Sequence, residues 1–440
     1  MINALKRVAD IFIEKTRGKN IKIISHFDTD GITSTGIISL LLKKLNVGFN
    51  IKIVTQLDKD YIINLKDKIN KEDVLIFLDL GSSHIKELGD LGIDVFIFDH
   101  HEISERETNT NVFFINPHLF GPEVVSAAGV CYLFAKSLGR ADKDMANLAV
   151  IGMVGDVLEK EISKLNNEIL NDAEIKMQKG LLLYPSTRPI HKTLEYSNVF
   201  IPGVTGDPLG VYRLLNECGI KKEKGTYKSL LELNEEELSK LITAILLRTK
   251  TSEKELIGNI YLIKFFNKLS DVREISAMIN ACSRLSYPEV ALSLCLQNEG
   301  AKKKAEDLYV KYKQEIVKGL NFVQENKIEG KNYAIINAKN NIKDTIIGTV
   351  ISILINSMDK NKGMIIIGMA YKGDTIKVSA RISRNNEDKN AREILNEIVK
   401  KIGGECGGHK KAAGCIISKE NEEKFIESLK KRLEIEIIKI

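Results

Sequence analysis

The sequence predicts an α/β protein with a doubly wound, mostly parallel sheet, an inserted helical module, and a second, smaller α/β domain joined by a long helix. Apolar runs and helical patterns alternate over residues 1–157, which favours a parallel sheet with helices on both faces. A stretch with denser proline and glycine then interrupts this alternation. Further on, apolar residues three or four positions apart mark a long helix, after which strand and helix patterns resume.

The length of 440 residues is too great for one ordinary hydrophobic core, so several domains are expected. The changes of pattern give the boundaries. The expected parts are the first part of the sheet domain (1–177), the inserted helical module (178–270), the return of the sheet domain (271–300), the connecting helix (301–326) and the second domain (327–440).

Composition narrows the class of protein. The formal net charge is +6, with 65 basic and 59 acidic residues, which is compatible with a nucleic-acid partner but does not require one. The six cysteines include no CxxC pair, so we expect reduced thiols rather than a zinc site or a disulfide framework. The N-terminus lacks a secretory pattern and no apolar stretch has transmembrane length, which predicts a cytoplasmic protein without a membrane partner.

The first domain carries apolar runs that are typical of buried strands. Between them, residues 32–45 and 142–154 have helical periodicity. In doubly wound sheets, ligands bind at the carboxyl ends of the strands, so the residues that follow each run are the candidates for chemistry. The expected strands are residues 21–25, 51–55, 74–80 and 95–98.

The segment 25–31 is central to the functional interpretation. His26, Asp28 and Asp30 stand two residues apart, so an extended backbone would direct all three to one face, and Gly31 would permit a turn into the next helix. Two carboxylates and an imidazole on one face suit a divalent metal. The alternative is an ordinary Asx turn and helix cap, and the segment alone does not decide between them.

Other strand ends repeat this pattern. Asp79 closes the third expected strand, and Asp99, His100 and His101 follow the fourth. Asp156 follows the helix at 142–154 and would bring another carboxylate. A single aspartate after a strand is often only a turn residue, but several at one sheet edge favour a site. The candidate ligands are His26, Asp28, Asp30, Asp79, His100, His101 and Asp156.

This ligand set is large enough for two metal ions ~3.5–4 Å apart that share a bridging carboxylate. Mixed aspartate and histidine ligands without thiolates indicate Mn²⁺ or Mg²⁺, and the histidines favour Mn²⁺. Paired divalent ions suit hydrolysis of a phosphate ester, because one activates water while both neutralise phosphoryl charge. No Walker lysine loop precedes the first helix, which excludes a P-loop NTPase.

The later segments supply candidate substrate contacts. Arg188, His191 and Lys192 of the inserted module could contact a polyanion, although a solvated surface is the simpler interpretation. Residues 403–414 are glycine-rich and contain His409 and Lys410, which favours phosphate binding over a purely structural turn. In the second domain the expected strands are 333–337, 364–369, 376–382 and 414–417, and the expected helices are 345–358, 391–402 and 420–433.

These motifs resemble the DHH phosphoesterase superfamily. The resemblance rests on Asp28-Thr29-Asp30-Gly31, Asp79, Asp99-His100-His101 and Asp156, while the segment 403–414 resembles the accompanying DHHA1 domain. Asn116-Pro117, residues 126–129 and residues 279–284 are similar to further RecJ-type elements. The inserted stretch around residues 186–207 resembles the archaeal RecJ-like branch, which includes the GINS-associated nuclease.

The resemblance implies a Mn²⁺-dependent exonuclease, with Mg²⁺ as the alternative ion, that acts on single-stranded DNA or RNA in replication or repair. It implies catalytic roles for Asp30, Asp79 and His101. Ser283 departs from relatives that often carry glycine, and His26 stands where bacterial relatives often carry an acid. The implied metal ligands are His26, Asp28, Asp30, Asp79, His100 and Asp156, and the implied substrate contacts are Arg284, Arg381, Gly407, Gly408, His409 and Lys410.

Two alternatives stay open at this point. One is a phosphodiesterase for short oligonucleotides or cyclic dinucleotides, which dependence on chain length would distinguish. The other is a replisome scaffold that binds GINS and the replicative helicase, as in the degenerate eukaryotic relative of the superfamily. An intact ligand set argues against a site that serves only as a scaffold.

Overall fold

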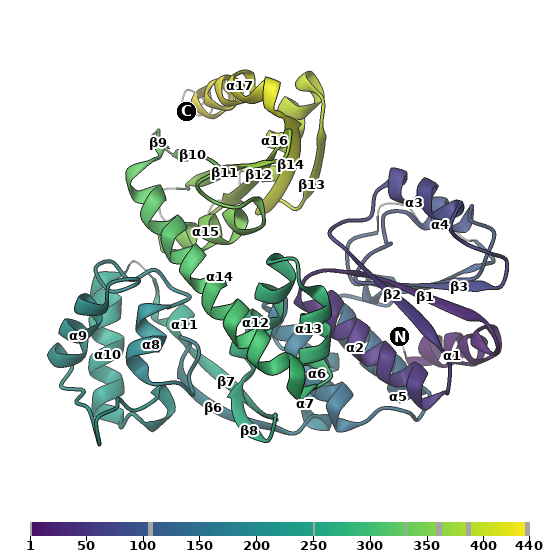
Figure 1. Ribbon diagram of the computed structural model, residues 1–440, viewed down its shortest axis with the longest axis horizontal. Helices are drawn as coiled ribbons and strands as arrows, with labels where there is room; N and C mark the ends of the chain where they lie inside the picture. Colours follow the sequence, from purple (N-terminus) through teal and green to yellow (C-terminus); the bar gives the residue numbers. More distant parts are fainter. Residues whose placement is uncertain are drawn as a thin grey trace. The chain divides into compact units, whose positions relative to one another are not determined.

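The computed structural model describes residues 2–103, 109–249, 251–330, 332–357, 363–383 and 389–435. The chain forms two compact units, one built from Met1–Lys179 and Asn259–Tyr309, the other from Gly180–Gly258 and Val310–Ile440. Figure 1 shows the elements of each unit in the colours of the sequence. Among the described helices, none is long and apolar enough to cross a bilayer.

The described part of the first unit contains a five-stranded sheet in the order β2-β1-β3-β4-β5, with every neighbouring pair parallel. This confirms the predicted parallel sheet. The predicted third strand ends two residues early, because Asp79 leaves the β region with φ 59°. The strands are β1 (Asn20–His26), β2 (Phe49–Val54), β3 (Asp73–Leu78), β4 (Val95–Phe98) and β5 (Val112–Ile115), of which the last was not predicted.

Both faces of the central strands β3 and β4 are buried, as continuous apolar runs require. Along β4, Val95 and Ile97 join a cluster with residues of α3 and α4, whereas the intervening Phe96 contacts Phe12 of α1 on the opposite face. The helices of this unit are α1 (Ile2–Thr16), α2 (Thr29–Lys44), α3 (Lys59–Lys66), α4 (Ile85–Gly89), α5 (Ala127–Ser137), α6 (Lys143–Gly155), α7 (Lys164–Asp172), α12 (Val272–Arg284) and α13 (Pro288–Cys295).

The inserted segment contains both helices and strands. Its helices α8 (Ile190–Glu195), α9 (Pro208–Glu217), α10 (Glu235–Arg248) and α11 (Glu253–Leu256) surround a core of their own. The helical module predicted over 178–270 also contains strands at both of its ends. Short apolar runs do not distinguish strand from helix by periodicity alone. Among the described residues, a three-stranded sheet is formed by β6 (Ile175–Leu181), β7 (Ile257–Phe265) and β8 (Lys268–Asp271).

The long helix and the second α/β region follow the prediction closely. Helix α14 (Glu299–Glu325) precedes a mixed sheet whose described strands are ordered β13-β14-β12-β11-β10-β9. Helix α15 packs directly on this sheet, since a Cβ at Gly368 would lie 2.7 Å from Ile347. The elements are β9 (Ile328–Glu329), β10 (Tyr333–Lys339), α15 (Asp344–Ser357), β11 (Ile365–Lys372), β12 (Thr375–Ile382), α16 (Ala391–Ile402), β13 (Glu405–Gly408), β14 (Ala412–Ser418) and α17 (Glu422–Ile435).

The glycine-rich segment 403–414 contains strand β13 and the start of β14, which form a β-hairpin. Strand β13 pairs with β14, and the hairpin closes through hydrogen bonds between His409 and Ala412. Part of its backbone is therefore already engaged in the sheet. Because β13 is the last strand of the sheet, its outer edge has no strand partner among the described residues.

Candidate metal centre

The first strand ends at His26, and helix α2 begins three residues later. Asp28 is the N-cap, and its Oδ1 accepts a hydrogen bond of 3.1 Å from the Gly31 amide, while Asp30 lies in the first helical turn. The backbone stays extended only as far as Asp28, so the helix-cap alternative holds there and Asp30 is helical. A Cβ at Gly31 would lie 2.3 Å from the His26 carbonyl oxygen, so only glycine permits this close approach.

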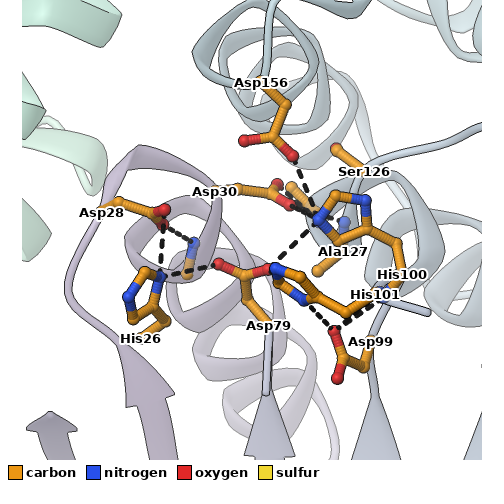
Figure 2. A network of polar contacts seen from close by, with 12 residues as sticks. His26, Asp28, Asp30, Asp79, Asp99, His100, His101, Ser126, Ala127 and Asp156 are labelled. Atoms are coloured by element: carbon orange, nitrogen blue, oxygen red, sulfur yellow. Dashed lines mark hydrogen bonds and ion pairs between the residues drawn. The ribbon is translucent and has the colours of Figure 1, made fainter. Parts of the chain in front are cut away.

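Asp79 occupies the centre of the site, between two histidines (Figure 2). Its Oδ2 lies 3.3 Å from His26 Nδ1, and its Oδ1 lies 3.4 Å from His100 Nε2. His26 Nδ1 also lies 3.0 Å from Asp28 Oδ2. The positive φ of Asp79, which aspartate tolerates better than most residues, turns its buried carboxylate into this position at the end of β3.

His100 faces three carboxylates that come from three different elements (Figure 2). Its Nε2 lies 3.2 Å from Asp156 Oδ2 and 3.7 Å from Asp30 Oδ2, in addition to Asp79. Asp156 is the C-cap residue of α6, the position at which the sequence placed it. The sheet edge, the start of α2 and the end of α6 thus converge on one imidazole.

The carboxylate of Asp30 is completely buried and is held by the start of helix α5. Its Oδ2 accepts a hydrogen bond of 2.7 Å from the Ala127 amide, and its Oδ1 accepts one of 2.9 Å from the Ala128 amide. Amides in the first turn of a helix have no partner within the helix, and together with the helix dipole they favour a negative charge at this position. Helix α6 also packs here, since a Cβ at Gly152 would lie 2.6 Å from Asp30 Oδ1.

His101 is held by the buried carboxylate of Asp99, which was not among the predicted ligands. Asp99 Oδ1 lies 2.7 Å from His101 Nδ1, and its Oδ2 accepts hydrogen bonds from the amide and hydroxyl of Ser82 at 2.9 and 2.5 Å. Asn116 donates to Ser82 Oγ at 3.0 Å. The His101 side chain is 41% exposed, so Asp99 fixes one edge of the ring while the rest is accessible.

Burial and mutual charge shift the pKa values across the cluster. Burial and the neighbouring Asp79 charge raise the pKa of Asp30 to about 7, and burial with the Asp30 charge raises that of Asp156. For His26 and His100, burial lowers the pKa, but the surrounding carboxylates outweigh it and raise the value well above normal. The metal-free cluster therefore shares protons near neutral pH in place of a cation.

The residues present fit a pair of divalent cations. Asp79 Oδ1 and Asp156 Oδ2 are buried, and within the described part of the chain neither accepts a hydrogen bond. Such orphaned carboxylate oxygens are costly unless a cation is bound. Carboxylate and imidazole ligands suit Mn²⁺ and Mg²⁺. The three groups of ligand atoms that could each hold an ion are His26, Asp28 and Asp79; Asp30, His100 and Asp156; and Asp79, His100 and His101.

The expected substrate contacts fall into two groups. Arg284 lies beside the metal centre, because its guanidinium covers the Phe27 ring at 5.6 Å and its Nε donates to Asn280 Oδ1 at 3.0 Å. Arg381 belongs to the second unit, where its Nε donates to Ser352 Oγ at 2.8 Å. In that unit, the exposed residues of the β13–β14 hairpin include Gly407, Gly408, His409 and Lys410.

Replacement of Asp99 by asparagine tests the support of His101. Asp99→Asn removes the negative charge but keeps the size, so the pKa of His101, which the Asp99 carboxylate raises against the effect of burial, should fall. Histidine NMR titration of the metal-free protein measures this directly. Loss of such an orienting partner typically costs about 10–100-fold in activity or metal affinity. An unchanged His101 titration would show that Asp99 is only a turn residue.

Three family models and several known proteins match the chain. Residues 20–153 match the DHH family, N-terminal domain; residues 183–256 match the DHH-CID domain; and residues 330–434 match the DHHA1 domain. The uncharacterized protein MJ0831 of Methanocaldococcus jannaschii is 30% identical over 419 residues, which is 92% of this chain and 91% of that protein. The chain belongs to the DHH family.

Two further proteins are similar to this chain, one in part of the sequence and both in fold. The single-stranded-DNA-specific exonuclease RecJ of Thermus thermophilus is 26% identical over 170 residues, covering 36% of this chain and 25% of RecJ. Its structure with Mn²⁺ has a TM-score of 0.60 and 18% identity, covering 97% of this chain and 54% of that one. CDC45 from Entamoeba histolytica has a TM-score of 0.70 and 14% identity, covering 98% of both chains.

Proposed function

We propose that this DHH-family protein is a metal-dependent exonuclease that hydrolyses phosphodiester bonds of single-stranded DNA or RNA from an end. One observation carries the proposal. The two oxygens of Asp79 face two different histidines, and each histidine has its own further carboxylates. A carboxylate in that position can serve two cations at once. Two Mn²⁺ ions, or Mg²⁺ as the alternative, are the cofactors that this arrangement supports.

The residues of the site have separable roles in this proposal. His26, Asp28 and Asp79 would hold one ion, and Asp79 together with Asp30, His100 and Asp156 would hold the second. When bound, the pair of ions would activate water and neutralise charge on the phosphoryl group. Asp99 fixes His101 so that its partly exposed ring faces the reacting phosphate.

Arg284 is the proposed substrate contact within the first unit. A guanidinium forms paired hydrogen bonds with phosphate oxygens, and stacking on Phe27 together with the Asn280 bond limits its movement. In the second unit, Arg381 and the exposed hairpin residues Gly407, Gly408, His409 and Lys410 are proposed to grip the nucleic-acid backbone. The exposed glycines leave room for close approach to phosphates.

Two further proposals follow from the relatives. One is a role in DNA replication or repair; the match to RecJ, which is named a single-stranded-DNA-specific exonuclease, supports single-stranded DNA as the substrate in that role. The CDC45-like fold is compatible with a second role as a replisome scaffold that binds GINS and the replicative helicase. The buried ligand set favours catalysis as the primary role, because gathering several buried carboxylates at one point is costly without a function.

A time course with end-labelled single strands tests the activity. Strands of DNA and RNA, long and very short, carry a label at the 5′ or the 3′ end and are incubated with Mn²⁺. Stepwise release of mononucleotides from long strands is the expected result, and the label position gives the direction. Cleavage confined to oligomers of a few nucleotides or to cyclic dinucleotides would establish the alternative phosphodiesterase. No cleavage of any strand would contradict the proposal and leave the scaffold role.

Metal binding should strengthen as the pH rises from about 6 to 8. In the metal-free protein the raised pKa values of Asp30 (about 7) and Asp156, and those of the two histidines, keep protons on the cluster that a cation must displace. Raising the pH removes these protons, so affinity for Mn²⁺ increases. Calorimetric titration in buffers of different ionisation enthalpy measures both the affinity and the protons released. Affinity that does not change with pH, with no proton release, would contradict this prediction.

A further inference from the structure

The inserted segment carries an aromatic and basic surface cluster that the proposed catalysis does not use. Helix α9 contributes Tyr212, and the following loop contributes Lys222 and Tyr227. Lys222 Nζ lies 5.6 Å from the centre of the Tyr212 ring and 5.5 Å from that of Tyr227. The two rings are inclined by only 29° with centres 6.2 Å apart. We call Tyr212, Lys221, Lys222, Lys224 and Tyr227 the Tyr–Lys face.

The two tyrosines differ in burial, which makes one an anchor and the other a contact surface. Tyr227 is only 7% exposed, whereas Tyr212 is 39% exposed. Lys222 lies close to both rings, so the cation–π interaction holds its ammonium near the exposed ring. The result is a flat, accessible aromatic surface with a positive charge fixed beside it.

The charge of the Tyr–Lys face is not compensated. Lys221, Lys222 and Lys224 are exposed, and none forms an ion pair with a carboxylate of the described residues. The carboxylate between them, Glu223, is already paired with Lys228 at 2.8 Å. Acidic residues of the adjoining helices likewise have partners of their own: Glu195 with Lys192, Asp207 with Arg213, and Glu217 with Arg248.

We propose that the Tyr–Lys face is a second binding site for single-stranded nucleic acid, separate from the metal centre. The lysines contact backbone phosphates, and an unpaired base stacks on Tyr212, the combination that sequence-tolerant single-strand sites use. A duplex offers no unstacked base to the ring, so single strands are the preferred occupant. The choice of nucleic acid as the ligand rests on the proposed function. The uncompensated charge and the exposed ring are observed independently of that function.

Binding to the full-length, metal-free protein tests this site without reading catalysis. Fluorescence anisotropy of a labelled oligothymidine in EDTA should show about 5- to 100-fold weaker binding for Tyr212→Ala, and near-normal binding for Tyr212→Phe. The triple variant Lys221→Ala, Lys222→Ala, Lys224→Ala should lower the slope of log affinity against log salt by about 2, since each phosphate contact in a single strand contributes about 0.7.

A matched variant removes the same charge elsewhere. This second triple variant replaces three exposed lysines that form no ion pair among the described residues: Lys52→Ala, Lys254→Ala and Lys424→Ala. It should bind the oligothymidine nearly as tightly as the unmodified protein does. On irradiation, a single strand that contains 5-iodouracil should crosslink to the peptide containing Tyr212. Equal losses in both triple variants, or unchanged affinity for Tyr212→Ala with no crosslink, would overturn the proposal. In that case a protein partner becomes the occupant to seek.

The outcome is distinguishable from failure of the proposed function. If the protein cleaves no strand but the anisotropy results hold, the exonuclease proposal fails and the Tyr–Lys face stands. If cleavage proceeds and the Tyr–Lys variants bind normally, only this second site fails. Hydrolysis of a dinucleotide should be unaffected by Tyr212→Ala, because so short a substrate at the metal centre has no further nucleotides for the Tyr–Lys face.

Discussion

Asp79→Asn should reduce hydrolysis by about 10²–10³-fold, the scale for removing a principal group that stabilises transition-state charge. The two Asp79 oxygens lie 3.3 Å from His26 Nδ1 and 3.4 Å from His100 Nε2. Asparagine keeps the size but presents an amide to one of the two ligand groups. It is preferable to alanine here because asparagine also tolerates the positive φ of this position, 59°.

Initial rates at saturating Mn²⁺ measure the effect, and circular dichroism confirms that the variant folds. Asp60→Asn is a matched control, because Asp60 is an exposed aspartate in the first turn of α3. Single-strand binding by Asp79→Asn should persist, since the Tyr–Lys face and the hairpin residues are unchanged. Activity within about threefold of the unmodified protein, well below one tenfold step of 1.36 kcal/mol, would contradict a central role for Asp79.

Asp30→Asn should lower both stability and activity. The buried Asp30 carboxylate accepts hydrogen bonds from the Ala127 and Ala128 amides, at 2.7 and 2.9 Å. An asparagine side chain can accept only one of them, and its NH₂ group then faces the other N–H donor. Leaving a buried donor unsatisfied costs about 1–3 kcal/mol. Loss of a ligand carboxylate should in addition reduce hydrolysis by about 10²–10³-fold.

Denaturant unfolding of the metal-free protein separates these two consequences. A lower free energy of unfolding without metal reflects the lost hydrogen bond at the start of α5. A smaller stabilisation on addition of Mn²⁺ reflects the weakened cation site, because ligand that binds only the native state adds stability according to its affinity. Unfolding and Mn²⁺ stabilisation equal to those of Asp60→Asn would show that Asp30 is neither a structural acceptor nor a ligand.

Much of the site was predictable because parallel strands end at one edge of a sheet. Asp79, the Asp99–His101 run and Asp156 each follow an apolar element whose boundary is visible in the sequence. Their convergence follows from the alternating α/β pattern and needs no information on side-chain contacts. The helix was predicted to begin at residue 32, but α2 begins at Thr29. The Asp28 side chain caps the helix there, before the apolar pattern starts.

The remaining features depend on contacts that leave no local pattern. The amides that hold Asp30 belong to Ala127 and Ala128; the motif at residues 126–129 is visible in the sequence, but its contact with Asp30 is not. The strands β6, β7 and β8 pair across the inserted segment, so their partners are distant in the chain. The glycine-rich segment was predicted to bind phosphate, but its pairing as the hairpin β13–β14 depends on cross-strand partners that the sequence does not show.

The most direct test of the central claim is an anomalous diffraction experiment on crystals of the protein grown or soaked with MnCl₂. Two manganese peaks are expected, one on each side of the Asp79 carboxylate. One should lie beside His26 and Asp28, and the other beside His100 and Asp156. Crystals of Asp79→Asn should show at most one of these peaks. A single peak in the unmodified protein, or peaks that do not contact Asp79, would contradict a paired-cation centre built around that residue.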